Sequence, residues 1–110
     1  MEIKVIAENI KNGLNKADTI IECNEVSITD TDRIYISFTE SVDAHGLTKQ
    51  DLIRLDIKFG CSVEEYILNK AEEYVKWLLQ VMCVSAKLEL DCEPRHGGKE
   101  LWVYGDIVIN

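Results

Sequence analysis

The sequence contains one proline and six glycines among its 110 residues. Unfolded segments are usually rich in such residues and poor in apolar ones, whereas 46% of this chain is hydrophobic. Long disordered tracts are therefore not expected. A chain of this length has room for one hydrophobic core that needs neither disulfides nor metal, so we interpret residues 1–110 as a single domain.

Paired cysteines, a signal peptide and a long apolar run are also missing. The four cysteines are scattered without a CxxC pair, as Cys23, Cys61, Cys83 and Cys92. No basic stretch followed by an apolar run opens the chain, and nowhere do about 18 apolar residues follow one another. These absences predict a soluble cytoplasmic protein with reduced thiols and no membrane span.

Basic residues are scarce. Twelve Lys and Arg face twenty Asp and Glu, which gives a formal net charge of −8. This charge repels phosphate backbones and anionic lipid headgroups, so direct binding to nucleic acid or to membranes is not expected. The same charge also favours solubility, and that interpretation needs no partner.

Catalytic motifs are absent as well. The only histidines are His45, in a polar loop over residues 40–50, and His96. A general base needs an orienting group, and no such pattern surrounds either histidine. We therefore predict no catalytic residue and no cofactor, and we regard an enzyme as the less expected class.

A metal site and a reactive thiol are two further alternatives. Cys83, Cys92 and His96 could converge, but their spacing fits no standard zinc pattern, and Cys92 has the parity of a buried strand residue. Cys61 lies just before a predicted helix, where a thiol pKa can fall, yet no histidine adjoins it. We predict no metal site, and the sequence leaves any chemical role of these residues open.

Two helices are predicted from apolar residues at three- and four-residue spacing. The first covers Glu2–Asn12 and stops at Gly13, although Glu2–Ala7 also alternates like a strand. The second covers Val63–Val84 and follows a capping box formed by Ser62 and Glu65. Its apolar face is broad and is predicted to contain Val63, Ile67, Leu68, Ala71, Tyr74, Val75, Leu78, Leu79, Val81 and Met82.

Strands are predicted where apolar and polar residues alternate. A hairpin is expected between Thr19 and Thr39, with its turn at Asp30–Asp32 and a bulge near Asn24. Further strands are expected at Ile53–Phe59, at Leu88–Cys92 and, beyond a turn through Gly97 and Gly98, at Leu101–Ile109. The last strand is apolar on both faces, which indicates a central strand or one that contacts a partner.

These elements predict an α+β fold in the order α-β-β-β-α-β-β. A mostly antiparallel sheet of about five strands would pack one face against the long helix and the shorter N-terminal helix.

Surface patterns point to a protein partner. Acidic side chains share one face of a strand and the outer arc of the long helix, and aromatic rings share one face of the last strand. These candidate binding residues are Glu89, Asp91, Glu93, Glu72, Glu73, Trp102 and Tyr104. Rows of carboxylates steer basic proteins, and Trp and Tyr anchor interfaces, although a solvated face and core rings are the alternatives.

In size and charge, the chain resembles phage-encoded inhibitors of host defence and bacterial immunity proteins. The leading hypothesis is a non-enzymatic acidic protein that docks on a basic surface of a protein partner, such as a nucleic-acid-binding protein. The alternatives are a small enzyme or ligand- or metal-binding domain with its site near residues 40–50 and 94–99, a homodimer, and a structural subunit of a larger assembly.

Overall fold

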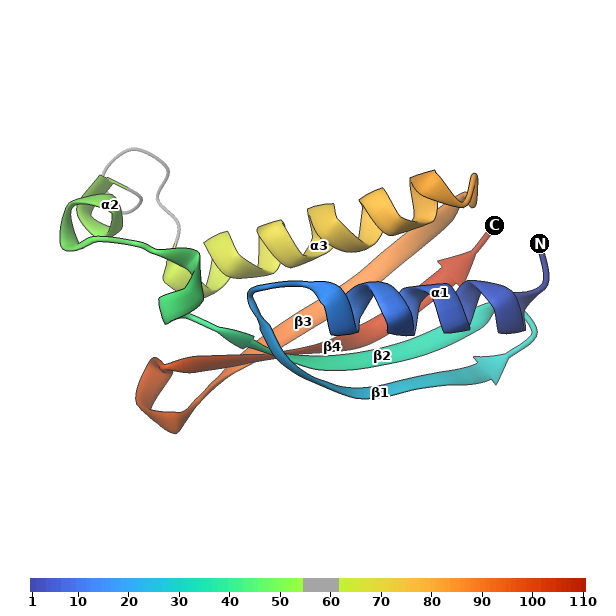
Figure 1. The fold of residues 1–110 in the computed structure, drawn as a ribbon, viewed down its shortest axis with the longest axis horizontal. Coiled ribbons are helices and arrows are strands. Elements are labelled where there is room, and N and C mark those ends of the chain that lie inside the picture. The colour runs from blue at the N-terminus through green and yellow to red at the C-terminus, as the bar shows by residue number, and fades with distance from the viewer. Residues whose placement is uncertain (55–61) are drawn as a thin grey trace.

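The computed structural model describes residues 1–54 and 62–110, and it confirms the α+β class (Figure 1). The sheet has four antiparallel strands in the order β1-β2-β4-β3, and α1 and α3 lie on the same face of it. The elements are, in chain order, α1 (Ile3–Lys16), β1 (Ile20–Asp30), β2 (Arg33–Ser41), the 3-10 turn η1 (Asp43–His45), α2 (Lys49–Arg54), α3 (Val63–Val81), β3 (Ala86–Arg95), the 3-10 turn η3 (His96–Gly98) and β4 (Glu100–Ile109).

The described residues form a sheet of four strands, where about five were predicted. Ile53 and Arg54, which open the strand predicted over Ile53–Phe59, belong to α2, and the rest of that prediction lies outside the described residues. A local capping box explains the helix. Thr48 Oγ1 accepts a hydrogen bond from the Asp51 amide at 3.1 Å, and the Asp51 carboxylate accepts one from the Thr48 amide at 2.9 Å.

The core lies between the helices and the sheet. Its fully buried side chains come from α1, α3 and the two central strands, and the largest are Ile10, Leu14, Ile34, Ile36, Phe38, Ile67, Val75, Leu101, Val103 and Ile107. The predicted long helix is confirmed, with its last residue at Val81 instead of Val84. Val81 was predicted on the apolar face but is 65% exposed, because it lies in the last turn of α3 beyond Leu79.

The predicted stop at Gly13 is wrong, because α1 continues through this residue to Lys16. Leu78 of α3 packs against Gly13 so closely that an added Cβ would lie 2.6 Å from Leu78 Cδ2. The Tyr74 hydroxyl also donates a hydrogen bond to the Gly13 carbonyl oxygen at 2.6 Å. Gly13 is therefore a contact point between the two helices. Helix α1 itself confirms the helical interpretation of this segment over the strand alternative.

The predicted bulge and the predicted central strand are both confirmed. The register between β1 and β2 shifts between Cys23 and Glu25, so Asn24 is the extra residue. This shift lets Cys23 and Val26 both pack against the core. Strand β4 pairs with β2 on one side and with β3 on the other.

Ser62→Ala is expected to lower the free energy of unfolding by about 1 kcal/mol. The Ser62 hydroxyl oxygen accepts a hydrogen bond from the Glu65 amide at 3.2 Å, and alanine leaves that amide without its cap. Urea denaturation followed by circular dichroism measures the change. Ser62→Asp is the control, since aspartate keeps a cap acceptor and should stay near wild-type stability.

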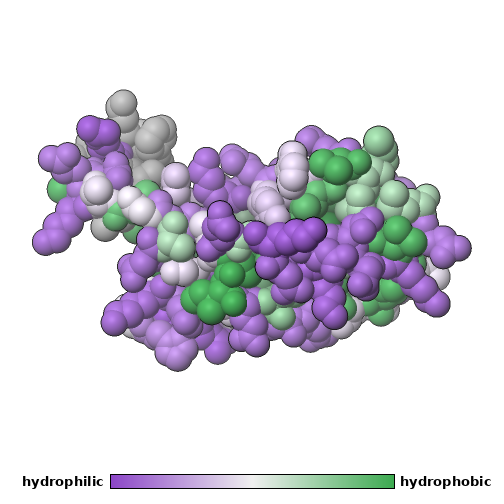
Figure 2. Space-filling model, viewed as in Figure 1, coloured by the Kyte–Doolittle hydropathy of each residue, from purple (hydrophilic) through white to green (hydrophobic). Residues whose placement is uncertain are grey.

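In the view of Figure 2 the molecular surface is mostly hydrophilic, with an apolar patch near the C-terminal part of α3. No helix in residues 1–54 and 62–110 is long and apolar enough to cross a membrane.

Candidate functional site

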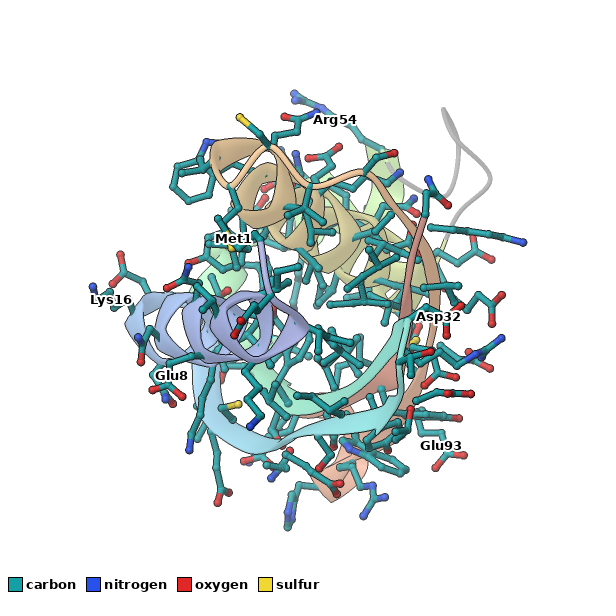
Figure 3. All side chains as sticks on the ribbon, turned by 90° about the vertical axis from the view of Figure 1, so that its right-hand side faces the viewer. Met1, Glu8, Lys16, Asp32, Arg54 and Glu93 are labelled. Atoms are coloured by element: carbon teal, nitrogen blue, oxygen red, sulfur yellow. The ribbon has the colours of Figure 1, made fainter. Side chains whose placement is uncertain are left out.

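The sheet face opposite α1 and α3 is not covered by any helix of the described residues (Figures 1 and 3). Glu93 points outward from it, away from both helices, in Figure 3. Across β3 and β4, Glu93 lies opposite Trp102 and Asp91 lies opposite Tyr104. Paired residues of neighbouring strands point to the same side, so the predicted acidic row of β3 and the predicted aromatic pair of β4 share this face.

The two rings form an ordered patch on the uncovered face. The Trp102 and Tyr104 rings are stacked, with centroids 4.2 Å apart, and the Arg95 guanidinium lies 4.5 Å from the Trp102 centroid. Trp102 Nε1 donates a hydrogen bond to the buried Ser37 hydroxyl on β2 at 2.6 Å. Both rings are half-buried, and the stacking and the hydrogen bond to Ser37 orient them on this face.

The carboxylates around the patch differ in how much charge they leave unpaired. Glu89 lies 3.9 Å from Arg33 and 3.8 Å from Lys87, and Arg33 also pairs with Asp106 at 3.3 Å. Sequence reasoning missed Arg33 and Asp106 because they reach Glu89 only through strand pairing. Asp91 and Glu93, at the aromatic end, are therefore the row's main source of negative potential.

The negative charges at this end of the face affect the pKa of Tyr104. Partial burial, together with the charges of Glu93 and Asp91, raises the pKa of the Tyr104 phenol above its usual value. The shift reinforces the protonated form that a tyrosine phenol already has at neutral pH, in which its hydroxyl is a hydrogen-bond donor.

Glu72 and Glu73, the other predicted binding residues, lie apart from this patch. Both belong to α3, which covers the opposite face of the sheet, and Glu73 lies 3.6 Å from Lys70. The structure thus brings Glu89, Asp91 and Glu93 together with the rings, while Glu72 and Glu73 form a separate acidic group.

The free edge of β3 is blunted near the aromatic patch. Pro94 has no backbone N–H, and the Cys92 N–H already donates to Asp91 Oδ1 at 2.8 Å. Proline and charged side chains on an edge strand disfavour pairing with another chain. The face of the sheet is therefore better suited to contact a partner than this part of its edge.

The two histidines lie in different surroundings. His45 Nε2 is 2.9 Å from Glu40 Oε2, and their side chains are only 9% and 3% exposed. His96 is exposed and lies 3.2 Å from Glu100. Sequence reasoning missed the contact between Glu40 and His45. The sequence feature that could have indicated it is the parity of Glu40, which is that of the buried Ile36 and Phe38, since a buried carboxylate needs a partner inside the fold.

The thiols do not assemble into a metal site in the described part of the chain, where no three metal-ligating side chains form a group. Cys92 packs against the core, and burial together with the Asp91 charge raises the pKa of its thiol. Cys83 is exposed at the end of α3. The alternative role for Cys61 lies outside the described residues.

Comparisons with protein-family models, with curated proteins and with solved structures give no match. The α+β fold and the acidic, aromatic sheet face are therefore the features on which a functional proposal can rest.

Proposed function

We propose that this chain is a non-enzymatic binding protein that docks its uncovered sheet face on a basic surface of a protein partner. The observation that carries the proposal is the stacked pair Trp102 and Tyr104 beside Asp91 and Glu93 on one face. Stacked rings bury a large area with few rotatable bonds, so they supply affinity. The carboxylates supply orientation and a fast encounter.

The charge of the chain selects the class of partner. A net charge of −8 attracts proteins with clustered Arg and Lys, and nucleic-acid-binding proteins carry such clusters. By covering that surface, the chain would compete with the nucleic acid and act as an inhibitor, in the manner of a phage anti-defence or immunity protein. Arginine also stacks well on aromatic rings, and Arg95 already does so on Trp102.

A deca-arginine peptide provides a first test of this face. The chain has two tryptophans, so a Trp77→Phe background leaves Trp102 as the only tryptophan reporter. We expect the peptide to change Trp102 fluorescence, with an affinity that falls steeply between about 50 mM and about 500 mM salt. In the same background, the double variant Asp91→Asn, Glu93→Gln should weaken binding at least about tenfold at low salt.

The matched control is Glu72→Gln with Glu73→Gln, which removes the same charge from the opposite face and should change affinity less than about twofold. Equal weakening by both double variants would show that only net charge matters and that the face has no special role. An affinity that does not change with salt would contradict the electrostatic part of the proposal.

The alternative partner for this face is a second copy of the chain, which would make a homodimer. Two copies in contact would bring the like-charged Asp91 and Glu93 rows of both chains close together, which opposes association. Solution mass measurement separates the two cases, because a dimer lost on Trp102→Ala would favour self-association.

The enzyme or ligand-site alternative was placed near residues 40–50 and 94–99. The two segments do meet, since the Val42 amide donates to the Lys99 carbonyl oxygen at 3.0 Å, and a hollow of about 370 Å³ lies there. Neither histidine lines this hollow. His45 instead lines a second hollow on the helix side of the molecule.

A further inference from the structure

Strand β1 adds a second line of carboxylates, Glu22 and Glu25, to the uncovered sheet face. The pairing of the four strands arranges this line and the acidic line of β3 into two rows that cross the whole sheet. One row is Glu22, Thr39, Trp102 and Glu93, and the other is Glu25, Ser37, Tyr104 and Asp91. Each row therefore has a carboxylate at both ends, with a hydroxyl and an aromatic ring between them.

The bulge at Asn24 places both glutamates on this face. Glu22 and Glu25 are three residues apart, so in a regular strand they would point to opposite faces. The register shift lets them pair with Thr39 and Ser37, which are only two residues apart on β2. Glu22 accordingly lines a hollow of about 390 Å³ together with Trp102 and Thr39. The acidic line of β1 thus lies on the same side of the sheet as the rings.

Basic groups lie toward the two ends of this face. At one end, Arg33 and Lys87 lie 3.9 Å and 3.8 Å from the Glu89 carboxylate, so their charges are already matched. At the other end, the exposed His96 lies 3.2 Å from Glu100. These contacts leave the middle of the face with an excess of negative charge.

The carboxylates of the middle are not neutralised by neighbouring cations. In residues 1–54 and 62–110, no ion pair is formed by Glu22, Glu25, Asp91 or Glu93. The Ser27 hydroxyl donates a hydrogen bond to Glu25 at 2.6 Å, which orients this carboxylate and leaves its charge. The one guanidinium nearby, that of Arg95, lies 4.5 Å from the Trp102 ring centroid. An arginine of the chain itself thus shows how a guanidinium can stack on this face.

The spacing of the two acidic lines matches the repeat of an extended chain. Strands β1 and β3 are separated by β2 and β4, so the lines lie three strand spacings, or about 14 Å, apart. Within each line the two carboxylates are about 6.8 Å apart, which is the two-residue repeat of a strand. An extended segment laid along the middle of the face sends successive side chains to opposite sides. Each line is then about 7 Å away, within the reach of Arg and Lys.

We propose that the uncovered face binds an extended segment of the protein partner that carries four consecutive basic residues, alternately directed to the β1 line and to the β3 line. This inference rests on the proposed function and adds to it the form of the partner's segment and two binding residues, Glu22 and Glu25. Arginine is favoured over lysine, because a guanidinium pairs with a carboxylate and also stacks on a ring, as Arg95 does on Trp102.

Two peptides of the same composition test the spacing. Ser-Ser-Arg-Arg-Arg-Arg-Ser presents four consecutive arginines, whereas Arg-Ser-Arg-Ser-Arg-Ser-Arg directs all four to one side of an extended chain and so engages one line only. Both are acetylated and amidated to keep their charge equal. Titration of Trp102 fluorescence in the Trp77→Phe background, at about 50 mM salt, should show the first peptide binding at least about threefold tighter. Equal binding, or tighter binding of the second peptide, would overturn the proposal.

Glu22→Gln with Glu25→Gln tests the second acidic line. We expect this double variant to bind the consecutive-arginine peptide at least about fivefold more weakly. Both side chains are exposed, and glutamine can still accept the bond from Ser27, so the fold should be retained. The matched control is again Glu72→Gln with Glu73→Gln, which should change the affinity less than about twofold. Equal weakening by both double variants would overturn the proposal in favour of an effect of net charge.

The outcomes also separate this inference from the proposed function. Weaker binding after Asp91→Asn with Glu93→Gln, but unchanged binding after Glu22→Gln with Glu25→Gln, would overturn the second line and leave the proposed function standing. Unchanged binding in both double variants would count against the proposed function as well. Should the variant of β1 fail to fold, the comparison of the two peptides still decides the question, because it uses the unmodified sheet face.

Discussion

Gly105→Ala is expected to lower the free energy of unfolding by roughly 3 kcal/mol or more. Gly105 has φ of 148°, a conformation that side chains disfavour, and an added Cβ would collide with the Glu89 carbonyl oxygen on β3. That oxygen belongs to the backbone of a paired strand, so it cannot move aside without disturbing the pairing of Leu90 with Gly105. Urea denaturation measures the loss.

Gly46→Ala separates the two causes of this effect. Gly46 also has positive φ, at 65°, but nothing lies within 4 Å of an added Cβ, so only the conformational penalty of about 1 kcal/mol applies. An equal loss of stability in both variants would contradict the close approach of the β3 backbone to Gly105.

Ile67→Ala is expected to destabilise the protein by about 2–5 kcal/mol. Ile67 is fully buried between α3 and the sheet, and truncation to alanine removes buried area and leaves a cavity. Thermal and urea denaturation, followed by circular dichroism, measure the change. The result tests the face that α3 turns toward the core.

The control on the same helix is Val81→Ala, because Val81 is 65% exposed. Its effect should stay within about 0.5 kcal/mol. A large loss at Val81 together with a small one at Ile67 would mean that α3 is rotated about its axis.

The sequence predicted elements correctly where the deciding interactions are local. The Ser62 cap needs only the Glu65 amide three residues later, and the turn between β1 and β2 is decided by a short polar segment. Gly13 shows the limit of such reasoning. It lies inside α1 and contacts Leu78 and Tyr74, which are more than 60 residues away in the chain and which helical periodicity does not reveal.

The proposed binding face was partly predictable for the same reason. The period of two places Asp91 and Glu93 on one side of β3, and Trp102 and Tyr104 on one side of β4. The hairpin register then brings both sides together. Glu72 and Glu73 could not be separated from this group by sequence, because helical periodicity does not reveal which face of the sheet a helix covers.

The contact between Glu40 and His45 could not be derived from the sequence. Glu40 is the next-to-last residue of β2 and His45 is the last residue of η1, so neither regular period relates the two side chains. The polar loop predicted over residues 40–50 gave no indication that Glu40 is buried. The identity of its partner depends on how the chain bends after β2.

The middle of the sheet joins two halves of the chain that are made at different times during synthesis. The hairpin of β1 and β2 meets the hairpin of β3 and β4 only where β2 pairs with β4. The bond from Trp102 to Ser37 crosses this junction and spans 65 residues of sequence. An incomplete chain that ends before β4 therefore lacks the aromatic patch, so the binding that we propose for this face requires β4 to have joined the sheet.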